Sequence, residues 1–310
     1  MLEEFFTLSV LVGIAHSGIR LATPYLYAAL GEMFAQRSGV LNLGVDGIML
    51  MGAFSAFYVV FHTENLWLGV LLALLVGGLL GLLMAVISVT MQAEQGISGI
   101  GLYLVGLGLS DLLFKTMIGS VVGVSGFSAV HIPWLSDLPI VGEIFFAHNL
   151  LIYLAYGLVP VSWFVLNKTT FGLKLRAVGH NPEAADSLGV RVNTVRYAAL
   201  ILGGALAGVA GASLSIGLLN VFQQNLTNGM GFIAVALVYF GSWRPFGILG
   251  GALLFSTVSA LQLWVQVKGI AIPSDLAVML PYLLTILALA LAVRQVQQPA
   301  ALTKPYERGE

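Results

Sequence analysis

Long apolar runs alternate with short polar connections along almost the whole chain. A run of about 20 apolar residues can cross the roughly 30 Å hydrocarbon core of a bilayer as an α-helix. Candidate runs lie at residues 6–30, 40–62, 66–91, 97–119, 149–166, 197–217, 229–242, 246–266 and 275–293. Backbone groups at membrane depth find no water, so these runs are expected to be helical. The pattern predicts about nine transmembrane helices, within a range of roughly eight to ten.

Two of these runs depart from the simple pattern. Residues 229–242 are short for a span and residues 97–119 are rich in glycine, so each is a candidate for a broken or re-entrant helix. In another run, small residues recur on one helical face at Gly204, Gly208 and Ala212. That spacing favours close packing against a second helix, and a hinge is the alternative.

The composition supports a membrane protein. The 310 residues are 58% hydrophobic and only 9% charged, whereas a soluble domain carries roughly 25% charged residues. Too few charges remain to cover a water-facing surface, so we expect an all-α polytopic membrane protein in which residues 1–310 form a single transmembrane domain. The start, MLEEFFTLSV, lacks the basic region of a secretory signal, so the first run is expected to be retained as a span.

Lysine and arginine are distributed unevenly among the connections. Five of the 13 basic residues fall in the loop 167–196, and three more follow the last run. Cytoplasmic loops carry an excess of Lys and Arg, so this loop is expected to be cytoplasmic. With nine spans, the C-terminus is then cytoplasmic and the N-terminus lies outside. Residues 121–149 form the one sizeable outer connection, expected to be a compact cap on the membrane surface.

The loop 167–196 contains one short, well-delimited helix. Asn181 is a good N-cap, Pro182 suits the first helical position, Glu183 favours the positive helix end, and Gly189 provides a left-handed stop. A helix of about two turns is marginal in water by itself. It therefore either packs on the cytoplasmic ends of its own protein, as part of a topological anchor, or docks onto a cytosolic partner. We favour docking.

Three blocks of sequence resemble a known family. They are GEMFAQRSGVLNLGVDGIMLMGAF, FGLKLRAVGHNPEAADSLGVRVNTVRYAALILGGALAGVAGA and GFIAVALVYFGSWRPFGILGGALL. The chain resembles, over nearly its full length, the permease subunit of bacterial ATP-binding-cassette (ABC) importers for ribose, simple sugars, nucleosides and branched-chain amino acids. It most resembles the sugar and nucleoside permeases. The resemblance implies that a coupling helix sits in a groove of an ATPase, with the residues Asn181, Pro182, Glu183, Ala184, Ala185, Asp186, Ser187, Leu188 and Gly189 in this role.

The same resemblance implies the partners of the chain. These are a cytosolic ABC ATPase, a second permease subunit that is identical or homologous, an extracytoplasmic substrate-binding protein, and the lipid bilayer of the bacterial cytoplasmic (inner) membrane. ATP would bind to the ATPase, and this chain would bind no cofactor. Transport would proceed by alternating access, driven by movement of the coupling helix.

Two groups of polar residues are candidates for the substrate pathway. Asn42 and Asp46 are four residues apart and share one helical face, where they either brace neighbouring helices or form part of an inner gate. Amides and an aromatic ring in the segment 220–232 suit sugars and nucleosides, although an ordinary solvated loop explains them too. These residues are Asn220, Phe222, Gln223, Gln224 and Asn225.

Absent motifs exclude several functions. The chain has no GxxxxGK[ST] phosphate loop, so it is not its own ATPase, and neither an HExxH motif nor any cysteine offers a metal site. No basic patch with interleaved aromatic residues points to nucleic acid. The alternative function is an ion-driven secondary transporter, which requires a buried acid near mid-membrane. Asp111 is the one acid that the pattern offers for this, although Lys115, four residues later, is expected to neutralise it.

Overall fold

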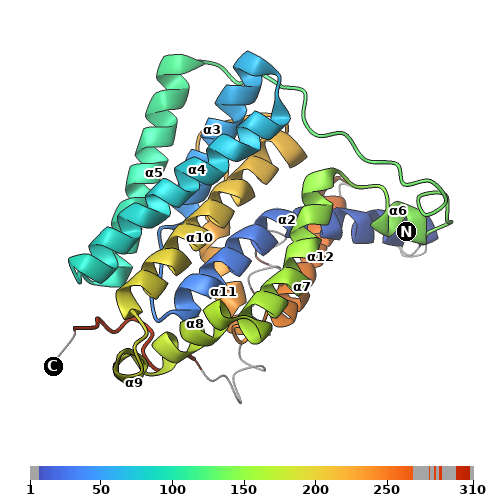
Figure 1. Ribbon diagram of the computed structural model, residues 1–310. Coiled ribbons are helices and arrows are strands. Elements are labelled where there is room, and N and C mark those ends of the chain that lie inside the picture. The colour runs from blue at the N-terminus through green and yellow to red at the C-terminus, as the bar shows by residue number, and fades with distance from the viewer. Residues whose placement is uncertain (1–6, 268–278, 280–282, 284–285, 288–297, 308–310) are drawn as a thin grey trace.

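The computed structural model describes residues 7–267, 279, 283, 286–287 and 298–307, which fold into helices joined by turns (Figure 1). No β-strand occurs in this part of the chain, only two isolated bridges. The all-α class is therefore confirmed. The helices are α2 (Leu8–Arg37), α3 (Val45–Thr63), α4 (Leu66–Ala85), η1 (Val86–Thr90), α5 (Gln95–Met117), α6 (Val141–Phe145), α7 (Leu150–Lys168), α8 (Thr170–His180), α9 (Pro182–Ser187), α10 (Val192–Ala212), η2 (Ser213–Leu218), α11 (Met230–Phe240) and α12 (Pro245–Val267).

Six helical segments of the described chain are long and apolar enough to cross a membrane. They are α3, α4 with η1, α5, α7, α10 with η2, and α12. The predicted number of nine is not supported. The run 6–30 lies in α2, which is not among the six, and the run 229–242 forms only the 11-residue α11. The run 275–293 lies almost entirely outside the described residues.

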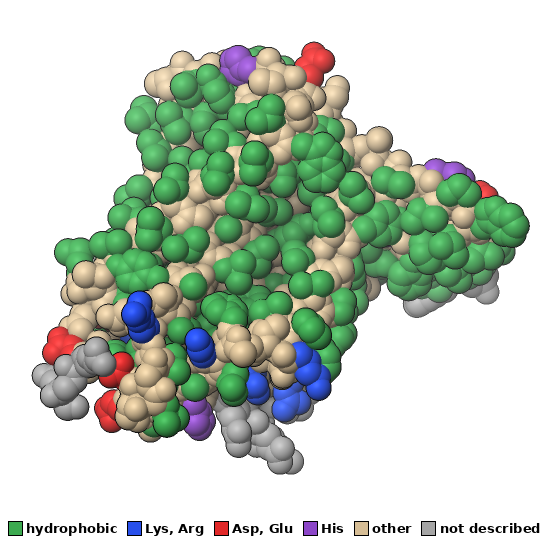
Figure 2. Space-filling view, viewed as in Figure 1, with side chains coloured by type: hydrophobic (Ala, Val, Ile, Leu, Met, Phe, Trp, Pro, Cys, Tyr) green, Lys and Arg blue, Asp and Glu red, His purple; other side chains and the backbone are tan. Residues whose placement is uncertain are grey.

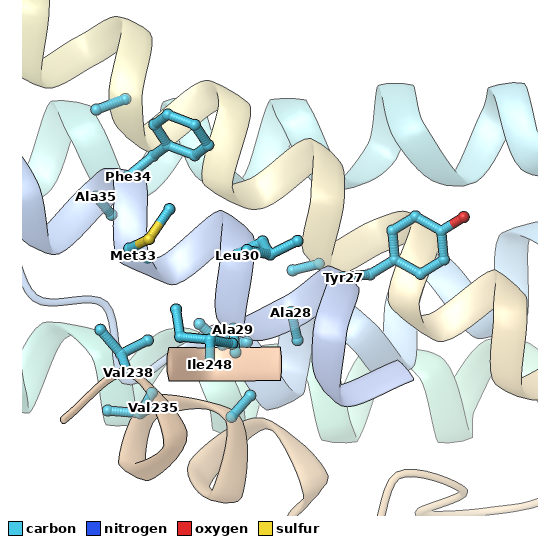
Figure 3. Packing of buried hydrophobic residues seen from close by; sticks show 14 of the residues in the cluster. Tyr27, Ala28, Ala29, Leu30, Met33, Phe34, Ala35, Val235, Val238 and Ile248 are labelled. Carbon is cyan, nitrogen blue, oxygen red and sulfur yellow. The ribbon is translucent and has the colours of Figure 1, made fainter. Parts of the chain in front are cut away.

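Helix α2 is the central helix of the bundle. It is 30 residues long, which suffices for a span, and it packs against α7, α10, α11 and α12. Its Leu30 belongs to one buried cluster with Val235 of α11 and Ile248 of α12 (Figure 3). Because protein surrounds the second half of this helix, that half can carry buried polar side chains such as Glu32 and Gln36. This position explains why α2 is less apolar than the six helices listed above.

Small residues allow α4 and α10 to cross at very short range. A Cβ atom placed on Gly208 of α10 would meet the carbonyl oxygen of Ala73 in α4, and one on Gly204 would meet that of Gly77. Ala212, one turn further, is fully buried in a cluster with Ala73. The predicted packing face is thus confirmed, because the described contacts leave no room for larger side chains.

Neither candidate for a broken helix contains a break, but the short run 229–242 forms the continuous helix α11 and an irregular segment precedes it. After η2 the chain runs irregularly through residues 219–229, and α11 begins where this segment meets α3. The glycine-rich run 97–119 likewise forms the continuous helix α5. Non-helical backbone inside a membrane bundle is tolerated where protein surrounds it, so the structure provides partners at the irregular segment.

The two ends of the bundle carry different connections. At one end, here called the α6 end, residues 118–149 run from α5 past α6 to α7 in a largely extended path rather than as a compact cap (Figure 1). There His16 of α2 stacks on His148, with the ring centroids 4.5 Å apart. Burial lowers the pKa of His148 to about 4, so its ring is neutral at physiological pH.

The opposite end, here called the α9 end, carries α8, α9 and residues 298–307. The N–H of Ala301 donates to the carbonyl of Gly179 at 3.0 Å, and that of Thr303 donates to the carbonyl of Gly39 at 3.1 Å. Glu94 caps α5 at this end. Its carboxylate accepts the N–H groups of Ile97 and Gly96, and these hydrogen bonds lower its pKa.

We predict that Gly208→Val destabilises the bundle by roughly 1–3 kcal/mol, because the new side chain must push α4 and α10 apart. Gly101→Val is the matched control, since a Cβ atom at Gly101 of α5 meets no atom within 4 Å. The thermal unfolding midpoint of each variant in detergent measures the effect. Equal midpoints for the two variants would contradict the close-packing interpretation.

Candidate functional site

The short helix α9 has the caps that its sequence predicts. The side chain of Asn181 accepts the N–H of Ala184 at 3.0 Å, and Pro182 occupies the first turn. Gly189 adopts a left-handed conformation with φ of +84°, and its N–H donates to the carbonyl of Asp186 at 2.8 Å. The helix comprises six residues, so its stability depends on what it packs against.

One face of α9 packs on the protein and the other is open. Ala185 is buried, and α9 contacts both α8 and α10. Leu188, directly after the helix, is 84% exposed although it is a large apolar residue. The remaining predicted coupling residues are exposed at Asn181, Glu183, Ala184, Ser187 and Gly189, and half-buried at Pro182 and Asp186. The helix is therefore anchored to its own chain and still presents a surface to a partner.

Tight contacts connect α8 and α9 to the end of α2. A Cβ atom on Gly179 of α8 would meet the carbonyl of Arg37, the last residue of α2. The buried Arg196 of α10 donates from Nε to the carbonyl of Ser38 at 3.3 Å. A displacement of α9 that carried α8 with it would therefore press on the α2–α3 connection, because backbone atoms of α8 and α2 are already in contact.

Asp46 accepts hydrogen bonds from the residues around the start of α11. Its side chain is fully buried, with Oδ1 accepting the N–H of Gly231 at 2.7 Å and Oδ2 accepting the hydroxyl of Thr227 at 3.0 Å. Gly229, the N-cap of α11, contributes a further backbone hydrogen bond. A carboxylate at the N-terminus of α11 satisfies unpaired N–H groups and complements the helix dipole. These hydrogen bonds are those of a brace between α3 and α11, one of the two roles expected for Asp46.

A second buried acid, Glu32, was not identified from the sequence. Its Oε1 accepts the side-chain N–H of Gln36 at 2.9 Å and the backbone N–H of Asn42 at 3.0 Å. Gln36 in turn accepts the indole N–H of Trp243 at 2.7 Å. This network joins α2, the loop before α3 and the turn before α12. The signal that could have revealed it is the four-residue spacing of Glu32 and Gln36, which places both on one face of the helix.

The predicted pathway residues do not form one cluster. Asn42 is buried, and its Oδ1 accepts the N–H of Gly44 at 2.9 Å. Phe222 is fully buried, and its ring packs against Phe54 and Phe114 with centroid distances of 5.5 and 5.3 Å. It anchors the irregular segment and is not available to stack on a solute. Asn220 is half-buried, and the exposed amides among the predicted residues are Gln223, Gln224 and Asn225.

Asp111 does not lie in the interior. Its side chain is 28% exposed on α5, where it forms an ion pair with Lys115 at 2.8 Å and accepts a hydrogen bond from Gln224. The expected neutralisation by Lys115 is therefore present. The acid suggested for ion coupling is on the surface, and the buried acids of the described chain in this region are Glu32 and Asp46. Hydropathy alone does not show which acids are buried in the protein and which lie on its surface.

A bundle of apolar helices of spanning length around a central helix, with one irregular segment inside, defines a multi-pass membrane protein. The chain belongs to the family described as branched-chain amino acid transport system / permease component, whose family model matches residues 14–289. Membership of this family confirms the resemblance to importer permeases. No solved structure gives a significant match.

Three relatives match nearly the full length of the chain. A Haloferax volcanii protein, provisionally named as a glucose ABC transporter permease, is 38% identical and covers 97% of this chain and 99% of its own. A guanosine ABC transporter permease of Bacillus subtilis is 35% identical, with 93% and 94% covered. A nucleoside ABC transporter permease of Lactococcus lactis is 36% identical, with 90% and 92% covered. Each organism has a second such permease, at 27%, 25% and 24% identity respectively.

We predict that Asp46→Ala destabilises the fold by roughly 3 kcal/mol or more, because it leaves buried donors at the start of α11 without partners. Asp46→Asn should lie between wild type and Asp46→Ala, since an amide retains one acceptor oxygen. Asp111→Ala is the control, because its ion pair with Lys115 lies at the surface of the protein rather than between helices. Thermal unfolding of purified protein measures all three, and equal midpoints for Asp46→Ala and Asp111→Ala would refute the bracing role.

Proposed function

We propose that the chain is the transmembrane permease subunit of an ATP-driven importer for nucleosides or simple sugars. The observation that carries the proposal is its similarity, at 35% to 38% identity over at least 90% of its length, to three permeases named for glucose, guanosine and nucleoside transport. Hydroxyl-rich solutes of this kind suit the exposed amides of Gln223, Gln224 and Asn225, which are free of the aromatic cluster that buries Phe222.

In this proposal ATP binding and hydrolysis occur on a separate cytosolic ABC ATPase, and α9 is the coupling helix. The support is the combination of a well-capped helix, a buried anchor at Ala185 and an exposed apolar side chain at Leu188. A partner that covered Leu188 would remove its large apolar side chain from water, which is favourable. Force on α9 would reach α2 and α3 through Gly179 and Arg37, and the bundle would then alternate between outward-open and inward-open states.

The proposed orientation places the α9 end in the cytosol of a bacterial cell and the α6 end outside the cytoplasmic membrane. Figure 2 shows charged side chains gathered at the α9 end, below a surface that is mostly hydrophobic. An excess of Lys and Arg on one side of a membrane protein favours the cytoplasmic side. An extracytoplasmic substrate-binding protein would then deliver solute at the α6 end.

We further propose that the second permease subunit is a different chain. In each of three organisms, one permease is 35% to 38% identical to this chain and a second is 24% to 27% identical. This pattern favours a pair of diverged subunits, in which the present chain is of the first type. The asymmetry would leave the substrate pathway lined by two different sets of side chains.

The ion-driven alternative is less favoured. A coupling acid needs a charge state that changes during transport. The carboxylate of Asp46 is occupied by three donors of the α11 start, and Glu32 is held within a network of backbone and amide groups. Their arrangement is that of structural braces, which leaves the coupling of transport to the ATPase.

Leu188→Ser should lower recovery of the ATPase subunit with the purified permease about tenfold, because a large apolar contact is removed from the proposed interface. Leu173→Ser is the matched control, since Leu173 is an exposed leucine on α8 outside α9. Both variants should insert normally, as judged by membrane abundance. Unchanged recovery in Leu188→Ser, or equal losses in both variants, would contradict a coupling role for α9.

Uptake of labelled nucleosides and of glucose in a transporter-deficient host tests the cargo and the subunits together. We expect ATP-dependent uptake of one of these solutes only when this chain, a second permease, the ATPase and the binding protein are all expressed. Omission of the second permease should abolish uptake and copurification of a complex. Uptake by this chain alone, abolished by an ionophore, would instead support the ion-driven alternative.

A further inference from the structure

A basic pocket lies at the α9 end, between the adjoining ends of α7 and α12. Its volume is about 810 Å³, which is within the usual range for small-ligand sites. We call it the arginine pocket and define it by Arg37, Arg176 and Arg244, with Trp163 and Phe246 as its apolar wall. A smaller neighbouring pocket shares Arg37 and Arg176 and adds His180. Arginines from α2, α8 and the turn before α12 thus line one pocket.

The charges of the arginine pocket are not balanced within the described chain. Within the described part of the chain, ion pairs join Lys115 to Asp111 and His131 to Asp137. No described carboxylate therefore pairs with the three arginines. Arg37 is fixed, because its Nε and Nη2 donate to the carbonyl of Trp243 at 3.1 and 2.8 Å. The positive charges of Arg176 and Arg244 both act on it. Converging guanidinium groups that repel one another are stabilised by an anion, above all by a phosphate.

The surface on either side of the pocket is apolar. Trp163 and Phe164 of α7 and Phe246 of α12 are exposed. Towards the α6 end, the same two helices contribute Tyr156 and Leu253 to a separate apolar groove, which α2 and α6 also line. Aromatic residues beside basic ones are typical of the membrane–water interface. A ligand that fits both surfaces has an anionic head and a long apolar body.

We propose that the arginine pocket binds the phosphate headgroup of an anionic phospholipid, whose acyl chains lie along the seam of α7 and α12. Basic pockets between membrane helices on the cytoplasmic side are suited to anionic headgroups. An acidic segment of the ATPase would match the charge of the pocket but not its apolar continuation along the helices. The proposal needs the α9 end to lie at the membrane surface and is independent of the cargo.

Native mass spectrometry of the full-length protein tests this proposal. The protein is released from nanodiscs of phosphatidylcholine with a minor fraction of phosphatidylglycerol. We expect wild type to retain phosphatidylglycerol in preference to phosphatidylcholine. The double variant Arg176→Gln/Arg244→Gln should lower that preference about tenfold or more, because two charge contacts are lost. Arg37 is kept, since it also ties α2 to the turn at Trp243.

The matched control is Lys168→Gln/Lys174→Gln, which removes the same charge from α7 and α8 outside the pocket. It should retain the wild-type preference. Equal losses in both double variants, or no preference in wild type, would overturn the proposal. Displacement of the lipid by glycerol phosphate would point to a soluble anion instead. If Arg176→Gln/Arg244→Gln loses the ATPase subunit in pure phosphatidylcholine but keeps the lipid preference, the pocket is a protein contact and the proposal fails.

Discussion

The carboxylate of Asp46 allows a helix to begin within the bundle. Backbone N–H groups at membrane depth have no water to bind, so a helix that begins there needs an acceptor from elsewhere in the protein. Asp46 of α3 accepts donors from the irregular segment and from the start of α11, which lie more than 180 positions away in sequence. This contact ties the irregular segment and the start of α11 to α3, while α11 packs on α2 through buried apolar residues.

Around this brace, the fold depends on close contacts between the backbones of neighbouring helices. Gly204 and Gly208 bring α10 against α4, and Gly179 brings α8 against the end of α2. Such contacts transmit displacement, because backbone cannot yield as a flexible side chain does. In the proposed mechanism, this rigidity allows the six-residue helix α9 to transmit movement of the ATPase. A partner that moved α9 together with α8 would then press on the α2–α3 connection through Gly179.

Local chemistry could be predicted from the sequence, and long-range burial could not. The caps at Asn181 and Gly189 and the packing face at Gly208 depend on neighbours within a few residues, so the pattern indicated them. The central position of α2 could not be predicted, because hydropathy does not show whether a helix contacts lipid or other helices. Glu32 was missed because its network is completed by Trp243, and Phe222 was taken for a binding ring because its aromatic partners lie on other helices. The roles proposed for α9 and for the exposed amides remain predictions.

The segment 298–307 is short, yet it contributes backbone partners to both Gly179 and Gly39. A premature stop codon before Ala301 would spare every helix from α2 to α12 and still remove both hydrogen bonds. The truncated polypeptide would be made, inserted and recognisable by antibody, but its coupling region would lack part of its support. If the chain is the permease of the proposed importer, such an allele would resemble a loss of the ATPase subunit rather than a loss of the permease itself.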